Sequence, residues 1–316
     1  MMSIEPSIKI EEIINEVEKV IVGKRHVVKL SLTALLAGGH VLLEDVPGVG
    51  KTMMVRTLSK TIGVSFKRIQ FTPDLLPADV TGVSIFNPET RDFEFRPGPV
   101  MGNIVLADEI NRTAPRTQAA LLEGMAENSV TVDGITRKLA NPFFVMATQN
   151  PIEYEGTYAL PEAQLDRFLL KINIGYPTVE EEMQLLTLKQ YQDPLDQTQQ
   201  VVTLSELLDL KNKAKQVFID DVLKNYIIRL VDATRKHPSV ALGISPRGSL
   251  AFMQAAQAFA LIEGRDYVIP DDIQYLAPYI FTHRLILKSE AYYNEETAES
   301  IIASILKNTS VPVEKR

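Results

Sequence analysis

The sequence contains no cysteine among its 316 residues. Disulfide bonds, cysteine metal sites and a cysteine nucleophile are therefore excluded, and the composition fits a reducing compartment. The four histidines are His26, His40, His237 and His283. They are far apart and lack ligand spacing, so they predict ordinary surface or packing roles rather than a metal site. A GxSxG nucleophile motif is also missing.

Long apolar runs are scarce. The longest candidate, residues 27–43, is interrupted by Lys29, Gly38, Gly39 and His40. It falls short of the roughly 18 residues that indicate a membrane-spanning helix. Acidic residues are spread through the apolar positions of the N-terminus, which is not the pattern of a signal peptide. We therefore expect a cytoplasmic protein without a membrane span.

An excess of basic charge is absent as well. The chain has 33 basic and 40 acidic residues, which gives a formal net charge of -7. This balance argues against a general nucleic-acid-binding surface, although it leaves room for a local basic channel. With 45% hydrophobic and 23% charged residues, the composition is that of a folded protein. The length allows one large domain or two ordinary ones.

A phosphate-binding loop is the strongest pattern that is present. The stretch HVLLEDVPGVGKT is an apolar run, then a loop, and a segment with helical spacing follows. This order lets backbone N–H groups and a helix N-terminus point together at one anion. Gly48 and Gly50 would give backbone room, Lys51 would reach the β- and γ-phosphates, and Thr52 would coordinate Mg²⁺. Asp45 stands where the pattern GxxxxGK[ST] has its first glycine, so its carboxylate must point away from phosphate.

A further strand is predicted around residues 64–71, and short apolar runs predict strands at 103–107, 143–148 and 168–174. Unalternating strands joined by helices are typical of a parallel sheet covered on both faces, so we expect an α/β core. Two small β-hairpins are predicted as insertions, over residues 83–96 and 130–139. Helical spacing predicts helices at residues 7–21, 25–37 and 115–127.

The strand signals stop after Pro177. A capping box at Thr203 and Glu206 begins a series of predicted helices. The first contains LLDLKNKAKQVF (207–218), and the others cover about 221–236, 246–263, 270–283 and 295–308. We therefore expect an α/β core over 1–176, a helical connection over 177–205 and a smaller all-α lid domain over 206–316.

Two acids end the predicted strand at residues 103–107. In an open parallel sheet, Asp108 and Glu109 would lie at the edge where the glycine loop also lies. Asp108 would hold Mg²⁺ directly or through water, and Glu109 would accept a proton from the attacking water or orient it. The alternative is a pair of solvated acids at a strand end.

Three further polar residues are candidates for contacts to phosphate. Asn150 ends the predicted strand at 143–148 and can contact the same water or the γ-phosphate, but its spacing fits a turn residue equally well. Arg167 directly precedes a predicted strand, and Arg247 lies in the first turn of a lid helix. Either can neutralise charge on a transferring phosphoryl group, and either can instead form a surface salt bridge.

These segments together resemble the AAA+ ATPases and, within them, the MoxR family. The resemblance covers most of residues 20–290. It is carried by VIVGKRHVVKLSLTALLAGGHVLLEDVPGVGKT, RIQFTPDLLPADVTG, FEFRPGPVMGNIVLADEINRTAPRTQAALLEGMAE, PFFVMATQNPIEYEGTYALPEAQLDRF, GISPRG and THRLIL. It implies a P-loop AAA+ core with a parallel sheet, two small β-hairpin insertions and a smaller all-α lid.

The resemblance also implies roles for individual residues. The nucleotide would contact Val22, Gly23, Pro47, Gly48, Val49, Gly50, Lys51, Thr52, Met53 and Asp108. Thr52 and Asp108 would hold Mg²⁺. The catalytic set would be Glu109, Asn150 at sensor 1, Arg247 at sensor 2 and Arg167 as an arginine finger. Because such a finger serves a neighbouring subunit, a ring is implied, usually a homo-hexamer, with Arg112 and Arg116 as rival interface arginines.

MoxR-like proteins act as chaperones, so the resemblance implies hydrolysis of ATP, with Mg²⁺, to remodel or activate a partner protein. The client would be a protein with a von Willebrand A domain or a metalloenzyme in maturation. A DNA-handling AAA+ motor stays open because Arg137 and Lys138 lie in the second hairpin. A magnesium-chelatase-type ATPase subunit and a nucleotide-dependent scaffold with little hydrolysis stay open too, although Glu109 and Arg167 count against the scaffold.

Overall fold

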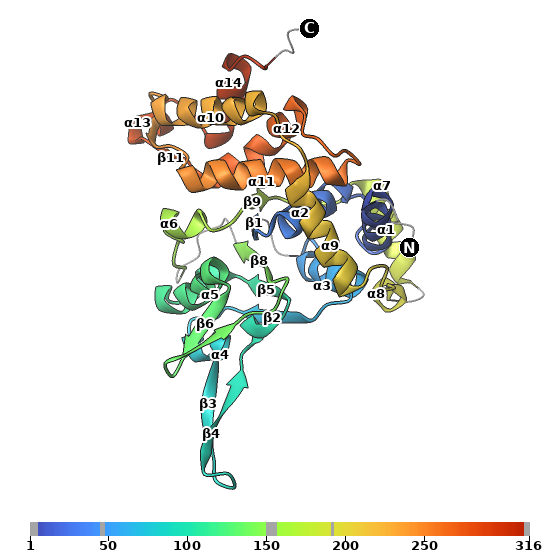
Figure 1. The fold of residues 1–316 in the computed structure, drawn as a ribbon. Coiled ribbons are helices and arrows are strands. Elements are labelled where there is room, and N and C mark those ends of the chain that lie inside the picture. Colours follow the sequence, from blue (N-terminus) through green and yellow to red (C-terminus); the bar gives the residue numbers. More distant parts are fainter. Residues whose placement is uncertain (1–5, 45–47, 150–156, 191–192, 313–316) are drawn as a thin grey trace.

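The computed structural model describes residues 6–44, 48–149, 157–190 and 193–312. Within these residues, five parallel strands form a sheet in the order β2-β5-β8-β1-β9 (Figure 1). The strands are β1 (Val41–Glu44), β2 (Phe66–Gln70), β5 (Ile104–Asp108), β8 (Phe144–Gln149) and β9 (Leu170–Ile172). The predicted parallel sheet is therefore confirmed. We call the edge where the strands begin the amino edge and the edge where they end the carboxyl edge.

Both faces of the sheet are covered by helices. Successive strand residues point to opposite faces, so each strand contributes side chains to both layers. In β1, Val41 and Leu43 pack into one buried cluster and Leu42 into the other. The first cluster is covered by α1 (Pro6–Glu18), α2 (Arg25–Ala37) and α3 (Lys51–Thr61). The second is covered by α4 (Pro77–Thr81) and α5 (Pro115–Glu127). Two apolar faces explain why the central strands β1, β5 and β8 show no alternation in sequence.

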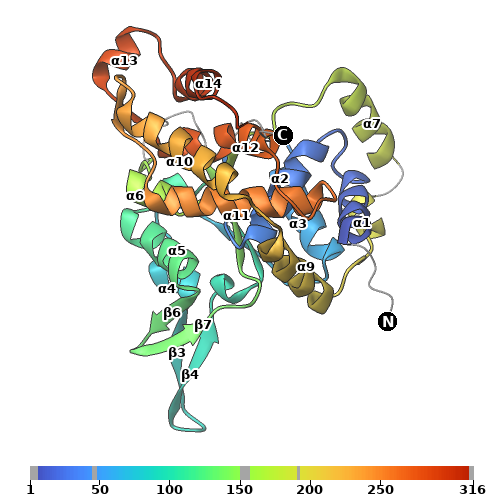
Figure 2. The ribbon, with the colours of Figure 1, turned by 45° about the horizontal axis from the view of Figure 1, so that its top comes forward.

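Both predicted hairpins are confirmed. One pairs β3 (Gly82–Asn87) with β4 (Asp92–Pro97), and the other pairs β6 (Ser129–Val132) with β7 (Ile135–Lys138). Asp133 and Gly134 both have positive φ, as the predicted Asp-Gly turn requires. Figures 1 and 2 show the β3–β4 hairpin projecting from the sheet, away from the C-terminal helices.

The chain after β8 is mainly helical. Its elements are α6 (Glu162–Leu165), which precedes β9, then α7 (Val179–Lys189), α8 (Pro194–Gln197), α9 (Leu204–Gln216), α10 (Asp221–Lys236), α11 (Pro246–Ile262), α12 (Pro270–Phe281), α13 (Ser289–Tyr293) and α14 (Ala298–Asn308). Two short strands, β10 (Val240–Leu242) and β11 (Ile286–Leu287), pair antiparallel. The sequence did not predict this ribbon, because two or three residues are too few to show alternation.

The first buried cluster continues from the sheet into the C-terminal helices. It includes Ile10 of α1, Val41 of β1, Phe252 of α11 and Phe281 of α12. Helix α2 lies between, packed against α9 and α11. The sheet and the helices after it are thus held by one shared apolar layer. None of the helices in the described residues is long and apolar enough to cross a membrane.

Candidate functional site

The glycine loop leads from the carboxyl end of β1 into α3. Asp45 and Pro47 lie outside the described residues. Gly48 and Gly50 have φ angles of 91° and 88°, and a Cβ added to either would meet nothing within 4 Å among the described residues. The left-handed backbone, which glycine adopts without a Cβ penalty, is therefore the reason for glycine here. The room for phosphate that the sequence predicts at these two glycines stays a prediction.

Helix α3 begins directly after this loop with an open N-terminus. Gly50 is its N-cap and provides no side-chain hydrogen bond, while Lys51 and Thr52 form the first turn. The first backbone N–H groups of a helix lack partners within it and carry partial positive charge. This end of α3 can therefore hold an anion beside the two residues predicted to bind phosphate and Mg²⁺.

A pocket of about 410 Å³ lies beside the loop. Its walls come from the connection between α1 and α2, from the glycine loop and α3, and from the chain around α7. The lining residues include Val20, Ile21, Val22, Gly48, Val49, Gly50, Met53, Tyr176, Pro177, Leu185 and Leu186. Five of the predicted nucleotide-contacting residues, Val22, Gly48, Val49, Gly50 and Met53, therefore line one apolar pocket.

Gly23 has a different surrounding from its neighbour Val22. Its φ is 74°, and a Cβ added to it would lie 1.8 Å from Oε1 of Glu181. Lys24 next to it donates a hydrogen bond to the carbonyl of Tyr176 at 2.9 Å and pairs with Glu181 at 3.6 Å. Gly23 thus permits the close approach that joins the α1–α2 connection to the start of α7.

The predicted acid pair lies at the same carboxyl edge as the glycine loop. The acids follow β5 and the loop follows β1, and β8 lies between these two strands. Thr148 of β8 connects the two acids. Its Oγ1 donates to Oδ1 of Asp108 at 2.7 Å and accepts the backbone N–H of Glu109 at 2.7 Å. Glu109 has a φ of 57°, so the chain turns sharply there and the strand ends.

The acid side chains contact donors from β2 and from the turn that follows β5. Arg68 pairs with Oδ2 of Asp108 at 2.6 Å. Oε2 of Glu109 accepts from Gln70 Nε2 at 2.9 Å and from Arg112 Nη1 at 2.9 Å. Both acids are therefore held by hydrogen-bond donors rather than surrounded by solvent alone.

Sequence reasoning missed Arg68, Gln70 and Thr148 as part of this site. The register that aligns Gln70 with Asp108 depends on β2 being the neighbour of β5, which the sequence does not state. The only available signal was that Thr148 is two residues before Asn150. Asn150 itself lies outside the described residues, and β8 ends at Gln149.

Arg167 and Arg247 lie at the opposite, amino edge of the sheet. Arg167 precedes β9, and its Nη1 donates to the carbonyl of Leu122 in α5. Its Nε is buried without a hydrogen-bond partner in the described structure. Arg247 is exposed in the first turn of α11. In one chain, the structure does not bring these arginines together with the glycine loop or the acid pair.

His40 lies at the same amino edge of the sheet. It directly precedes β1 and is fully buried, accepting the N–H of Val145 at 3.0 Å and contacting the carbonyl of Met125 at 3.2 Å. Burial lowers the pKa of His40 to about 4, and the nearby charge of Arg247 contributes to this lowering. Arg247 lies two residues after Ser245, whose Oγ donates to Oδ2 of Asp166 at 3.1 Å just before β9, so it belongs to the amino edge, whereas the glycine loop follows the carboxyl end of β1.

Comparisons with known proteins agree with this architecture. The family described as "ATPase family associated with various cellular activities (AAA)" matches residues 40–170, and the AAA lid domain matches residues 232–305. The chain is 61% identical over 302 residues to the uncharacterized protein YeaC of Bacillus subtilis, covering 96% of this chain and 94% of that protein.

Two further relatives have informative names. Chaperone MoxR1 of Mycobacterium tuberculosis is 45% identical over 312 residues, covering 96% of this chain and 82% of that protein. A crystal structure named as a putative ATPase, from Cytophaga hutchinsonii, has a TM-score of 0.91 and 42% identity, covering 98% of this chain and 96% of that one. The likeness thus extends over nearly the whole chain.

Proposed function

Because the chain belongs to the MoxR family of AAA+ ATPases, we propose that it hydrolyses ATP to ADP and phosphate and uses this reaction to remodel or activate partner proteins. The observation that carries the proposal is the arrangement at the carboxyl edge. A glycine loop opening an uncapped helix and a linked pair of acids lie there on either side of β8.

The described residues fit ATP with Mg²⁺. The pocket of about 410 Å³ offers an apolar surface for a base next to a loop suited to phosphates. Its lining by Val22 and Met53 on one side and by Leu186 on the other supports binding of adenine. Lys51 would contact the β- and γ-phosphates, and Thr52 with Asp108 would hold Mg²⁺, which neutralises phosphate charge when it is bound.

The two acids would divide the work of hydrolysis. Glu109 would accept the proton of the water that attacks the γ-phosphorus, so that the bond to the ADP oxygen breaks and phosphate leaves. The hydrogen bonds of Thr148 hold Asp108 and the backbone of Glu109 in fixed relation. Asn150 would orient the same water. Gln70 and Arg112 donate to Oε2 of Glu109, so the water would donate to Oε1 or replace one of these donors.

The remaining arginines support assembly into a ring, for which we propose a homo-hexamer. Arg167 and Arg247 lie at the edge of the sheet opposite to the acid pair, where they are remote from their own glycine loop. Arg167 would therefore act on the phosphates of a neighbouring copy. Arg112, which pairs with its own Glu109 at 2.9 Å, and Arg116 remain rivals for this role.

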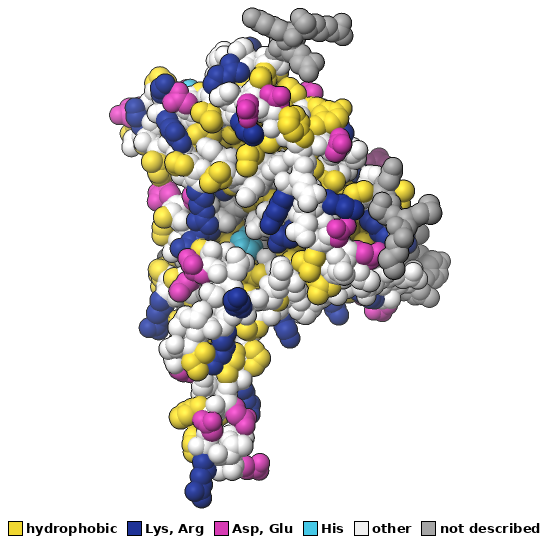
Figure 3. Space-filling model, viewed as in Figure 1, with side chains coloured by type: hydrophobic (Ala, Val, Ile, Leu, Met, Phe, Trp, Pro, Cys, Tyr) yellow, Lys and Arg dark blue, Asp and Glu magenta, His cyan; other side chains and the backbone are white. Residues whose placement is uncertain are grey.

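A protein client is favoured over DNA by the hairpins. The guanidinium of Arg137 stacks on the ring of Phe95 at 3.9 Å and donates to the carbonyls of Val132 and Ile135, so it is engaged within the hairpins. Figure 3 shows hydrophobic, basic and acidic side chains together on the projecting hairpin, without a basic stripe in that view. Phe93 is 67% exposed there. We propose a client with a von Willebrand A domain or an immature metalloenzyme.

ATP binding and turnover test the proposal directly. We expect Lys51→Ala to abolish nucleotide binding in a fluorescent-nucleotide titration, and Glu109→Gln to bind ATP but hydrolyse it about 10²- to 10⁴-fold more slowly. Lys60→Ala is the matched control on the same helix, because Lys60 contacts the carbonyl of Leu195 instead of the loop. Normal turnover by Glu109→Gln would refute its role as the base.

The client is tested with the same variant. Glu109→Gln held in ATP should retain its partner, so it is used as bait in lysate of the source organism, with Lys51→Ala as the control that cannot bind ATP. Recovery of a von Willebrand A protein or an immature metalloenzyme with Glu109→Gln alone supports the chaperone role. Recovery of DNA with replication or repair proteins contradicts it.

A further inference from the structure

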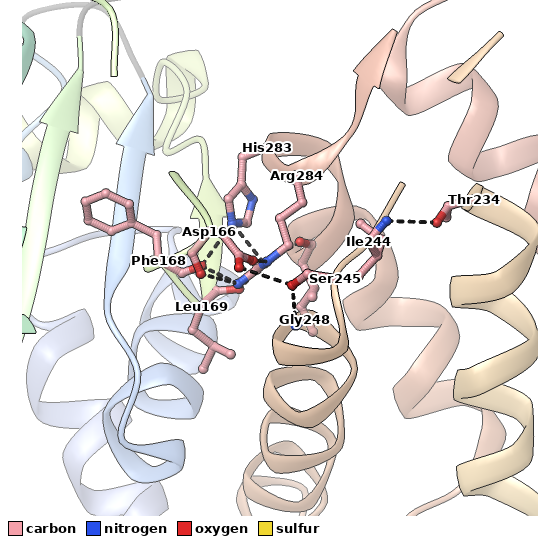
Figure 4. A network of polar contacts seen from close by, with 10 residues as sticks. Asp166, Phe168, Leu169, Thr234, Ile244, Ser245, Gly248, His283 and Arg284 are labelled. Atoms are coloured by element: carbon pink, nitrogen blue, oxygen red, sulfur yellow. Dashed lines mark hydrogen bonds and ion pairs between the residues drawn. The ribbon is translucent and has the colours of Figure 1, made fainter. Parts of the chain in front are cut away.

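One carboxylate, that of Asp166, contacts two separate elements of the C-terminal helical part. Asp166 ends α6 and directly precedes Arg167. Its Oδ1 accepts from Nε of Arg284 at 2.7 Å, and its Oδ2 accepts from Oγ of Ser245 at 3.1 Å (Figure 4). The two oxygens of Asp166 thus join the segment before β9 to α11 and to the turn after α12.

Arg284 holds the chain on the other side of Arg167 as well. Its guanidinium donates to the carbonyl of Phe168 at 2.5 Å and to that of Leu169 at 3.1 Å. The Arg284 side chain is only 3% exposed, so its charge depends on the carboxylate of Asp166 as partner. Residues 166, 168 and 169 are therefore fixed by one buried side chain, and Arg167 lies between them.

Ser245 transmits the same constraint to the start of α11. It is the N-cap of that helix, and its Oγ accepts the N–H of Gly248 at 3.2 Å. Arg247 lies in the turn that this hydrogen bond closes. Asp166 therefore ties the first turn of α11, and with it Arg247, to the segment that contains Arg167.

Both arginines are remote from the glycine loop and the acid pair of their own chain. They lie at the amino edge, while the glycine loop and the acid pair lie at the carboxyl edge. We propose that Asp166 is a positioning residue that joins Arg167 and Arg247 into one two-arginine face, which completes the nucleotide site of a neighbouring copy of this chain. This inference rests on the proposed function, and it gives Asp166 a positioning role toward both arginines.

Mixed assemblies test the proposal. Asp166→Ala subunits keep their own glycine loop and acids but present misplaced arginines, whereas Glu109→Gln subunits lack the base but present both arginines correctly. We expect Asp166→Ala alone to lower kcat for ATP by about 10²-fold, as a displacement of a catalytic group by about 1 Å would do. Its KM should change little. A one-to-one mixture with Glu109→Gln should regain turnover that neither variant shows alone.

Two variants separate positioning from general loss of stability. Asp166→Asn can still accept from Arg284 and donate to Ser245, so it should retain most of the wild-type kcat. The loss of the carboxylate charge beside the buried Arg284 should lower its unfolding temperature. Asp272→Ala is the matched control, because Asp272 forms a buried pair with Arg265 at 2.5 Å within the helical part and is not in contact with Asp166. We expect Asp272→Ala to lower the unfolding temperature without lowering kcat. If Asp166→Ala does not fold, Arg284→Lys replaces it, since lysine keeps the ion pair but loses the contacts to Phe168 and Leu169.

The outcomes distinguish the role of Asp166, the action of the two arginines and the hydrolysis of ATP itself. If Asp166→Ala has the same kcat as the wild type, the proposed role of Asp166 is wrong. It is also wrong if kcat is lowered and the mixture with Glu109→Gln does not restore it. Arg167→Ala and Arg247→Ala are tested in the same mixture, and failure of either to regain turnover contradicts its action in trans. Absence of ATP turnover in the wild type, with nucleotide and Mg²⁺ in excess, contradicts the proposed function itself.

Discussion

Removing the hydroxyl of Thr148 is the sharpest single test of how the acid pair is held. Thr148 is 2% exposed, and its Oγ1 bonds both Oδ1 of Asp108 and the N–H of Glu109 at 2.7 Å. Thr148→Val keeps the shape of the side chain but leaves the Glu109 N–H unpaired. An unsatisfied buried group costs about 1–3 kcal/mol, so we expect the free energy of unfolding to fall by about 2 kcal/mol.

The rate of hydrolysis should fall as well. Glu109 is held in a left-handed conformation that costs about 1 kcal/mol for a residue other than glycine, and the hydrogen bond from its N–H to Thr148 stabilises it. Without this bond the chain can relax and move both carboxylates, and we expect kcat to fall by about 10- to 100-fold.

The assays are urea unfolding, read as the midpoint and slope, and steady-state release of phosphate. Thr148→Ser is the matched control, because it keeps the hydroxyl and loses only a methyl group, at a cost of about 1 kcal/mol. It should therefore lose stability but keep its rate. If the valine and serine variants hydrolysed ATP equally fast, the bridge through Thr148 would have no part in holding the acids.

Two further predictions concern backbone conformation and pH. Gly50→Ala should lower the free energy of unfolding by about 1 kcal/mol, because φ is 88° and no steric clash adds to it; a variant as stable as the wild type in urea would contradict this. His40→Gln should flatten the pH dependence of stability. The folded pKa of His40 is lowered from 6.5 to about 4, so its contribution is complete above pH 6.5 and is lost as pH falls through about 4. Thermal unfolding of both proteins between pH 7 and 4 measures the difference, and parallel curves would refute it.

The parts of the fold that local chemistry determines were predictable. Asp133 and Gly134 gave the second hairpin because their turn requires positive φ, and Thr203 with Glu206 gave the start of α9 because they cap it reciprocally. The parallel sheet followed from unalternating apolar runs. The short helix α4 was missed, because its sequence reads as a proline- and aspartate-rich break.

The neighbours of the acid pair were not predictable in the same way. Arg68 and Gln70 occur in the strand predicted around residues 64–71, and the residues near them in sequence do not indicate a contact with Asp108 or Glu109. Their contacts follow from the order of the sheet, in which β2 lies beside β5, and from the register of that pair. Strand order is a property of the whole chain, so it appears only when all crossovers are placed.

The position of the two arginines shows what strand direction alone can tell. The glycine loop and the acids both follow a strand, whereas Arg167 precedes one. In a parallel sheet, residues that precede a strand and residues that follow one lie at opposite edges. The sequence therefore already indicated that Arg167 is separated from its own glycine loop by the length of the sheet. For Arg247 there was no such signal, because the sequence does not show at which edge of the sheet a helix of the C-terminal part packs. Its place follows from Ser245 contacting Asp166, a pair 79 residues apart that forms only when the C-terminal helices pack on the amino edge.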